Sequence, residues 1–252
     1  MISHPIHKIL KPIIIRCYAE LNDFLPQNKK QKSFSMSVKM PVTIEDIIVS
    51  LGIPLSEVDL ILLNSTPVRF GHKLKENDYV SLYPVFEQLD ISKINPQYHT
   101  PLCTSTFILD AHLGKLAGYL RMLGFDSLYR NDFGDKEIIE TAAHENRIIL
   151  TRDKLLLKSK RVTHGYYVRS TEKEEQLSEI VLKFDLYSQF KPFTRCMECN
   201  SILSPKAKSE ILNMVEPDTA EIYDEFYFCS SCDKVFWKGS HFKRMEAFIK
   251  GI

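Results

Sequence analysis

Two pairs of cysteines near the carboxyl end of this 252-residue chain have the spacing of a metal site: Cys196 with Cys199, and Cys229 with Cys232. Two thiolates separated by two residues can hold one metal ion from a tight turn, and two such turns complete a tetrahedron. Because all four ligands are cysteine, no position stays open for water, and the pattern predicts one structural zinc ion per chain. The alternative is four reduced cysteines without a metal.

Three other residues with ligand chemistry fall outside this pattern. His241 is a spare potential ligand, but four cysteines already complete the tetrahedron. Cys17 and Cys103 have no partner at metal-like spacing. We expect Cys17 to be a small buried apolar residue and Cys103 to be a thiol in a linker.

A second kind of chemistry is indicated by carboxylates that follow apolar runs. Asp110 comes directly after one strand-like run, and Asp153 lies just beyond another. Ligands collect at the carboxyl ends of parallel strands, so these side chains can converge there, and Asp135 can reach the same edge. Clustered carboxylates repel one another unless a cation holds them, which predicts magnesium or manganese. The alternative is that each acid caps a helix, with Asp135 an obvious N-cap candidate.

Cations near these acids are candidates for binding phosphate. Lys115 and Arg121 lie off the apolar stripe of the helix that follows Asp110, so both are free to face phosphate. Arg152 can neutralise developing phosphate charge or simply pair with a nearby acid. For Lys115 and Arg121 the alternative is a solvated charge on a helix surface.

The tail that follows the second cysteine pair is basic and aromatic. Lys238, Lys243 and Arg244 can neutralise phosphates, and Trp237 or His241 can stack on an unpaired base. The alternative for Trp237 is a ribbon strand whose indole packs inward.

The acids and cations require a scaffold of alternating strands and helices over residues 105 to 190. Strands are expected at 107–109, 125–130, 148–150 and 166–168. Helices are expected from the periodic apolar positions of 113–123, ended by Gly124, and of 138–143. A last helix through residues 177–184 is expected to begin with a capping box from Thr171 to Glu174. This order predicts a three-layer α/β domain with a parallel sheet.

Residues 1 to 88 have a different pattern. Strands are expected around 13–18, 34–38, 60–63 and 79–82, with a helix that begins at Thr43, where Asp46 completes a capping box, and ends at Gly52. The order β-β-α-β-β predicts a small α+β domain. Residues 89 to 104 carry Pro96 and Pro101 and are interpreted as a linker. Residues 191 to 252 contain the zinc ribbon, with strands on either side of the second cysteine pair.

Composition adds limits on location and charge. The formal net charge is +1, so the total gives no electrostatic indication of nucleic acid or membrane, although five basic residues face one acid between 234 and 250. No apolar run approaches the roughly 18 residues of a membrane span, and Lys8, Lys11, Pro5 and Pro12 interrupt any leader sequence. We expect a cytoplasmic protein.

The motifs of the second half resemble a known family. The chain contains D-x-x-L-G-x-L-x-x-x-L-R-x-L-G from Asp110 to Gly124, D-x-E from Asp135 to Glu137, and L-T-R-D from Leu150 to Asp153. It also contains R-C-x-x-C-N from Arg195 and W-K-G-S-H from Trp237. Together these resemble the PIN-like ribonuclease domain of the mut-seven-C family, named after the mutator-seven exonuclease, with its zinc ribbon. The resemblance implies that Asp110, Asp135 and Asp153 bind the catalytic metal, with Asp132 and Glu137 as weaker candidates for a fourth acid.

The first domain resembles the ubiquitin-like β-grasp sulfur carriers of the ThiS and MoaD type, through residues 61–68 and 74–86. Those carriers act through a free C-terminal Gly-Gly, whereas this chain has Phe86-Glu87-Gln88-Leu89 and then continues. The resemblance therefore implies the fold without the carrier chemistry, and a protein-docking role is expected. A β-grasp extension also occurs in some members of the mut-seven-C family.

Together, these patterns predict a metal-dependent ribonuclease. The alternative is a non-catalytic RNA-binding or adaptor protein that uses the zinc ribbon and the β-grasp domain. A dehalogenase-like phosphatase requires a second Asp two residues after Asp110, where His112 stands. A nucleotide-binding enzyme is disfavoured because no glycine-rich phosphate loop follows any strand.

Overall fold

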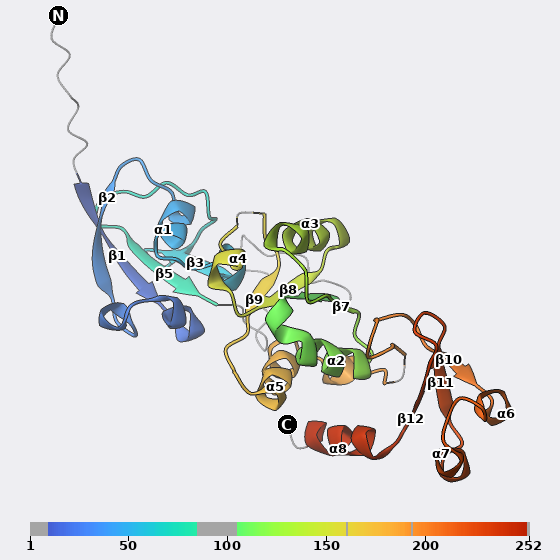
Figure 1. Cartoon of the computed structure of the whole chain (residues 1–252). Helices are drawn as coiled ribbons and strands as arrows, with labels where there is room; N and C mark the ends of the chain where they lie inside the picture. The colour runs from blue at the N-terminus through green and yellow to red at the C-terminus, as the bar shows by residue number, and fades with distance from the viewer. Residues whose placement is uncertain (1–9, 85–104, 160, 193, 251–252) are drawn as a thin grey trace, which may run out of the picture. The chain divides into compact units, whose positions relative to one another are not determined.

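The computed structural model describes residues 10–84, 105–159, 161–192 and 194–250 (Figure 1). The predicted linker at 89–104, with Cys103, lies outside these residues. The chain divides into two compact units. One comprises residues 1–102 with 153–166, and the other comprises residues 103–152 with 167–252. None of the helices in the described ranges is long and apolar enough to cross a bilayer.

The first unit contains a five-stranded sheet in the order β2-β1-β5-β3-β4. Its strands are β1 (Leu10–Cys17), β2 (Phe34–Lys39), β3 (Leu60–Leu63), β4 (Thr66–Pro67) and β5 (Tyr79–Tyr83). The central pair β1 and β5 is parallel, and the other pairs are antiparallel. This β-grasp arrangement confirms the expected α+β domain, although the two-residue strand β4 was not predicted.

The helix of this sheet, α1 (Ile44–Ser50), begins as its sequence indicates. The Asp46 amide donates to the Thr43 hydroxyl over 3.2 Å, and the Thr43 amide donates to the Asp46 carboxylate over 3.1 Å. Gly52, at φ +77, follows the last turn in the left-handed conformation that glycine adopts without a steric cost. Fully buried isoleucines on α1 and β1 meet in the core between helix and sheet.

A short segment of the second half packs with this first unit. It contains α4 (Lys154–Leu157), where Leu156 and Leu157 are buried. The Lys154 ammonium donates to the Asp23 carbonyl over 2.9 Å and lies 5.0 Å from the centre of the Phe24 ring. The predicted domain of residues 105–190 therefore contributes residues 153–166 to the other compact unit.

A four-stranded sheet has the order β7-β6-β8-β9, and its strands β7, β6 and β8 lie in the second unit. The strands are β6 (Phe107–Leu109), β7 (Ser127–Tyr129), β8 (Ile148–Thr151) and β9 (Gly165–Tyr167). β6 pairs in parallel with β7 on one side and with β8 on the other. Figure 1 shows α3 (Asp135–Glu145) on one face of this sheet and α2 (Gly114–Met122) with α5 (Lys173–Lys183) on the other, which confirms the three-layer α/β prediction.

Two predicted helix starts are wrong. The N-cap of α3 is Gly134, and Asp135 is the first residue of the helix itself. The N-cap of α5 is Glu172 without a side-chain cap, so Thr171 and Glu174 form no capping box. Instead the Ser170 hydroxyl accepts from the Glu172 amide over 3.2 Å. In both cases the expected N-cap residue, Asp135 or Thr171, lies one position away from the observed N-cap.

The ribbon follows as a three-stranded antiparallel sheet in the order β10-β11-β12. Its strands are β10 (Ser204–Lys206), β11 (Phe226–Cys229) and β12 (Lys234–Trp237), and its helices are α6 (Lys208–Ile211), α7 (Pro217–Ile222) and α8 (Ser240–Ile249). The strands on both sides of the second cysteine pair are confirmed. One buried cluster of the ribbon contains Cys196, Leu203 and Cys229, and Ile211, Ala220 and Phe226 of the ribbon are also buried.

Candidate functional site

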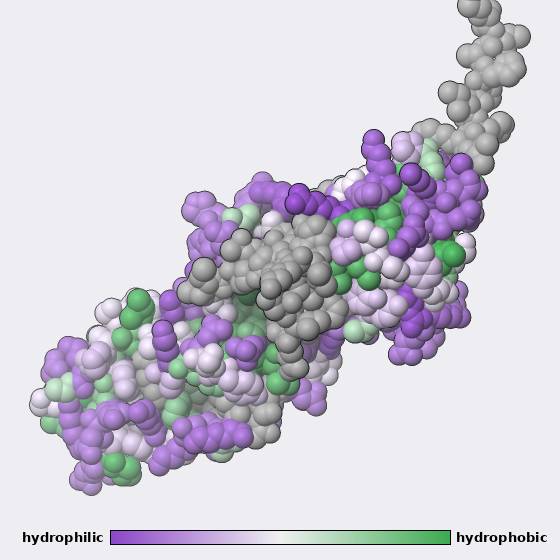
Figure 2. All heavy atoms as spheres, turned by 180° about the vertical axis from the view of Figure 1, so that it is seen from behind, coloured by the Kyte–Doolittle hydropathy of each residue, from purple (hydrophilic) through white to green (hydrophobic). Residues whose placement is uncertain are grey.

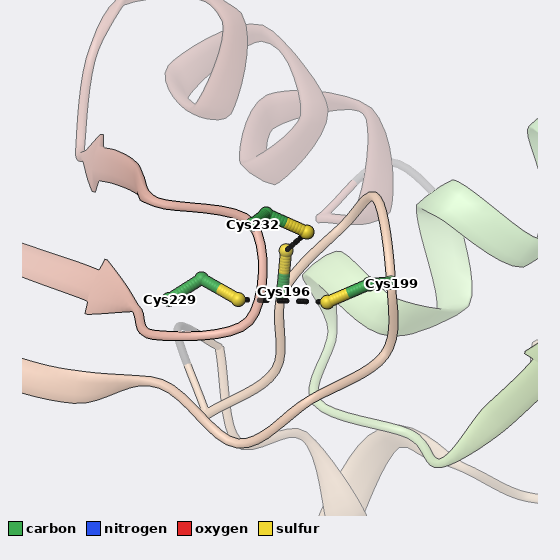
Figure 3. Close-up of side chains that lie close together, drawn as sticks. All are labelled: Cys196, Cys199, Cys229 and Cys232. Atoms are coloured by element: carbon green, nitrogen blue, oxygen red, sulfur yellow. Dashed lines mark hydrogen bonds between the residues drawn. The ribbon is translucent and has the colours of Figure 1, made fainter.

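The four cysteines of the two pairs gather at one point of the ribbon (Figure 3). Their sulfur atoms all lie within 4.8 Å of one another, with 3.9 Å from Cys196 to Cys232 and 3.5 Å from Cys199 to Cys229. A zinc ion with four Zn–S bonds of about 2.3 Å places its sulfurs about 3.8 Å apart, whereas a disulfide requires about 2 Å. The cluster therefore fits a tetrahedral metal such as zinc.

The two loops that present these cysteines share one backbone geometry. The amide of Asn200 donates to the Cys196 carbonyl over 3.0 Å, and the amide of Asp233 donates to the Cys229 carbonyl over 2.9 Å. Asn200 and Asp233 have φ values of 73° and 56°. Asn and Asp tolerate this left-handed conformation better than other residues with a Cβ, which explains their position directly after each pair.

The thiols of the cluster are strongly coupled. Burial raises the pKa of Cys196, and the hydrogen bond with Cys199 raises the pKa of Cys232 to about 12. Burial would also raise the pKa of Cys199, but hydrogen bonds from Ser201 and Cys232 outweigh it and lower this pKa to about 6. Without a cation, one thiolate is thus stabilised by neighbouring protonated thiols. A metal ion replaces those protons.

Arg121 anchors the first cysteine loop to the α/β sheet. The predicted role of Arg121 as a phosphate contact is wrong, because its side chain is only 4% exposed. Its guanidinium donates to the Ser127 carbonyl over 2.8 Å, to the Glu198 carbonyl over 2.8 Å and to the Met197 carbonyl over 3.2 Å. Burial lowers the pKa of Arg121, while the nearby cysteine thiolates favour its charged form. The positive charge of Arg121 therefore lies beside the cysteine cluster, in which Cys196 and Cys229 are buried.

A second set of contacts surrounds Asp126, and sequence reasoning missed it. The Asn200 side chain accepts from the Ser127 amide over 3.0 Å and donates to Asp126 over 2.8 Å. Arg195 and Arg147 form ion pairs with the same carboxylate at 3.0 and 2.7 Å. Burial raises the pKa of Asp126, but hydrogen bonds from Arg147 and Asn200 outweigh it and lower the pKa overall. The R-C-x-x-C-N motif contains both Arg195 and Asn200, so it was the available signal.

Asp110 is a buried carboxylate at the carboxyl end of β6, the strand that lies between β7 and β8. It is 6% exposed and follows β6 directly. Its Oδ2 accepts from the Thr151 hydroxyl and from the Arg152 amide, the latter over 3.0 Å, and its Oδ1 accepts from the His112 amide over 2.8 Å. Asp110 therefore links the carboxyl ends of β6 and β8, and the capping alternative holds for it as well.

The other predicted acids have different surroundings. Asp135 is exposed in the first turn of α3. Asp132 and Glu137 each form an ion pair of 2.9 Å with Arg130, which lowers the pKa of Asp132. Asp153 follows β8 and caps α4 by accepting from the Leu155 amide over 2.7 Å. Among the described residues, only the four cysteines form a group of three or more potential ligands close enough to hold one ion.

The predicted RNA-binding residues also differ in their surroundings. The Arg152 guanidinium donates to the carbonyls of Val168, Arg169 and Ser170, which are partners that the sequence did not indicate, and its role at phosphate stays a prediction. Lys238 forms an ion pair of 2.6 Å with Glu225. Lys115, Lys243 and Arg244 are exposed. Trp237 is partly buried, 6.4 Å from the Tyr223 ring, and His241 lies on α8 with its side chain outside the described structure.

One cation near the acidic edge was not expected. The side chain of Lys173, at the start of α5, lies near Lys115, and the proximity of this second cation lowers the pKa of Lys115. Two like charges repel each other. An anion placed between them would relieve that repulsion.

Two family models match the chain. Residues 105–249 match the Mut7-C RNAse domain, and residues 10–90 match the Mut7-C ubiquitin domain. The first match covers the α/β sheet and the ribbon together, and the second covers the β-grasp sheet. No curated protein matches the chain. The matched domain indicates a nuclease-like role, and the chain belongs to the Mut7-C RNAse domain family.

Proposed function

We propose that this protein is a metal-dependent ribonuclease that hydrolyses phosphodiester bonds of single-stranded or structured RNA. Family membership supports a nuclease-like role. The observation that carries the metal-dependent mechanism is Asp110, a buried carboxylate at the carboxyl end of the central parallel strand. Ligands of α/β sheets bind at that end.

The donor chemistry at this edge fits a hard divalent cation. A carboxylate has about four lone-pair positions, and the three hydrogen bonds of Asp110 leave one on Oδ1, from which the His112 Nδ1 lies 3.6 Å away. Magnesium commonly takes one or two carboxylates and keeps several waters, so it does not require three gathered acids. Asp110, Asp135 and Asp153 would hold magnesium or manganese, with Asp132 and Glu137 as weaker candidates. The ion would activate a water and stabilise phosphoryl charge.

The protein's own residues then position the substrate. The Thr151 hydroxyl and the Arg152 amide fix the orientation of the Asp110 carboxylate. The neighbouring side chains of Lys115 and Lys173 would bind a phosphate of the RNA backbone. Neither role requires a movement of the sheet.

Asp135→Asn tests the reaction with little effect on folding, because Asp135 is exposed. We expect magnesium- or manganese-dependent cleavage of single-stranded RNA to fall at least about a hundredfold, a loss typical of removing one transition-state charge contact. Glu140→Gln removes the same charge from the exposed surface of the same helix and should cleave like wild type. Equal cleavage by wild type and Asp135→Asn would remove Asp135 from the mechanism.

Asp110→Asn is a less clean variant for this purpose. An amide at this position keeps one acceptor oxygen, so either the Arg152 amide or the His112 amide would face an NH₂ group. Leaving a buried donor unpaired costs about 1–3 kcal/mol. Its cleavage should therefore be compared at equal fractions of folded protein, measured by circular dichroism.

Lys173→Ala tests the phosphate contact. We expect weaker RNA binding that is independent of sequence, and a logarithmic salt dependence whose slope is shallower by about one. Fluorescence anisotropy of labelled single-stranded RNA at several salt concentrations measures both. Lys183→Ala, at the other end of the same helix, is the matched control. An unchanged salt slope for Lys173→Ala would place RNA elsewhere.

A non-catalytic RNA-binding or adaptor protein remains the second candidate. It is favoured by the ion pairs that Asp132 and Glu137 make with Arg130, and by the separation of the predicted acids in the described structure. RNA binding without cleavage in magnesium or manganese would support it. We also propose that the ubiquitin-like domain docks a protein. Because the cysteines are reduced, we propose that the protein is located in the cytoplasm.

A further inference from the structure

An apolar cavity of about 280 Å³ lies within the second unit, beside the ribbon. It is lined by the end of α2, the first cysteine loop, β12 and the first turn of α8. Its walls include Met122, Met197, Phe236, Trp237 and Phe242, and Arg195 is the one charged residue among the described ones that line it. The volume is close to the lower end of the range for small-ligand pockets, about 300 Å³. The cavity suits one flat ring system.

Trp237 is held in a fixed position in this wall. A Cβ at Gly239 would come within 2.9 Å of the indole nitrogen, so glycine is what lets the ring lie against the backbone there. The Gly239 amide also donates to the Trp237 carbonyl over 2.9 Å. The centre of the Tyr223 ring lies 6.4 Å from the centre of the indole ring. A ring fixed in advance loses little conformational entropy when a ligand stacks on it.

Positive charge lies close to this cavity. Lys243 and Arg244 are exposed on α8, whose first turn forms part of the wall, and neither makes an ion pair with another described residue. Arg195 uses two of its five N–H groups on the Asn200 carbonyl and the Asp126 carboxylate. The other N–H groups of Arg195 can donate to the polar edge of a ligand. The surroundings favour a ligand that is flat, aromatic and attached to negative charge.

We propose that this cavity binds one unpaired nucleobase of the RNA, stacked on Trp237, while Lys243 and Arg244 contact the flanking phosphates. The proposal rests on the proposed function, since it takes RNA as the ligand. It assigns base recognition to a cavity shared by the ribbon and the α/β domain. Stacking on aromatic side chains is how proteins hold single-stranded bases without reading a duplex.

A protein partner fits this region less well. Figure 2 shows small groups of apolar atoms dispersed among hydrophilic ones over most of the coloured face it presents. Protein interfaces need about 800 Å² from each partner. A cavity of this size with basic residues beside it is better matched to a single base than to an apolar protein surface.

The chain offers a direct reporter, because Trp237 is its only tryptophan. The test titrates the full-length, zinc-loaded protein with a uridine hexanucleotide and with the corresponding abasic ribose-phosphate hexamer, without added magnesium or manganese. We expect the hexanucleotide to quench the tryptophan fluorescence in a saturable way and the abasic hexamer to leave it unchanged. Because no cleavage is measured, this result is independent of the catalytic proposal.

Ser240→Phe supplies a variant that should block the cavity. Ser240 is exposed at the cavity wall, so an added ring there fills space without disturbing a core. We expect the affinity for the hexanucleotide to fall about tenfold to a hundredfold, which is the effect of losing one stacked base. Leu212→Phe places the same ring at an exposed ribbon position outside the cavity and should bind like wild type. Equal zinc content in all three proteins shows that the ribbon is intact.

Three results would overturn the proposal. The first is RNA that binds, by anisotropy, without changing the tryptophan fluorescence. The second is equal quenching by the abasic hexamer, which would reduce the site to phosphate contacts. The third is a fluorescence change with an apolar peptide but not with RNA, which would make the cavity a protein-docking site. Loss of cleavage in Asp135→Asn with quenching retained would leave the cavity proposal standing.

Discussion

Replacing Cys229 with serine is expected to release the metal and unfold the ribbon. The Cys229 sulfur is fully buried and lies 3.5 Å from that of Cys199. Two of the three residues in the buried cluster at this end of the ribbon are cysteines of the metal site. Much of its stability should therefore come from the metal, since structural zinc provides about 10 kcal/mol or more at neutral pH. We expect zinc to fall from about one ion per chain to none, and the Trp237 emission to shift to the red.

The matched control is Ser230→Ala, which changes an exposed residue of the same loop that is not a ligand. It should keep its zinc and its emission maximum. Plasma emission spectrometry gives the metal content, and a chelator titration of wild type should reproduce the fluorescence change of Cys229→Ser. A carefully prepared wild-type protein that is folded and free of zinc would refute the metal assignment.

Replacing Arg121 with methionine is expected to destabilise the second unit by about 3 kcal/mol. Methionine keeps the apolar stem but removes the donors to the carbonyls of Ser127, Met197 and Glu198. It also removes the positive charge that favours the cysteine thiolates. Urea unfolding followed by Trp237 fluorescence should show an earlier midpoint, and zinc should pass to a chelator faster.

Two further variants separate these causes. Lys115→Met makes the same kind of change on an exposed part of the same helix and should leave the midpoint unchanged. Arg121→Lys keeps the charge but has no planar fork, so it should recover the slow zinc release better than the unfolding midpoint. If Arg121→Met unfolds at the wild-type urea concentration, then Arg121 is not the anchor described above.

Most of the strands, the zinc loops and the first helix were predictable because each follows from local rules, whereas the short strands β4 and β10 were not predicted. Spacing alone identified the four cysteines, and the capping box located the start of α1. The helices α6, α7 and α8 were not predicted. The helices α6 and α7, in the long insertion between the cysteine pairs, have too few turns to show a period.

Arg121 shows why the rest could not be predicted. Its helical spacing places it off the apolar stripe, and a cation there is normally solvated. Only the fold reveals that the first cysteine loop supplies two carbonyls at that place. The same holds for Arg152, because its hydrogen-bond partners are carbonyls of residues 168–170, which are distant in sequence. The position of a charge in sequence does not indicate which distant backbone will cover it.

The acidic edge was predictable only in part. The strand order explains why Asp110 lies at the end of the central strand, and Leu109 pairs with Leu150 as the parallel arrangement requires. The hydrogen bonds from Thr151 and the Arg152 amide were not predictable, because they depend on how the chain leaves β8. The roles of Asp110, Asp135 and Asp153 stay a prediction until cleavage is measured.

The contacts at Ser127 have a consequence for solubility. β7 is an edge strand, and the outward amide and carbonyl of Ser127 are occupied by Asn200 and Arg121. Open strand edges are templates for pairing with a second chain. Loss of the ribbon's metal would therefore uncover a site for aggregation on the α/β sheet, and the ribbon protects the neighbouring domain from self-association.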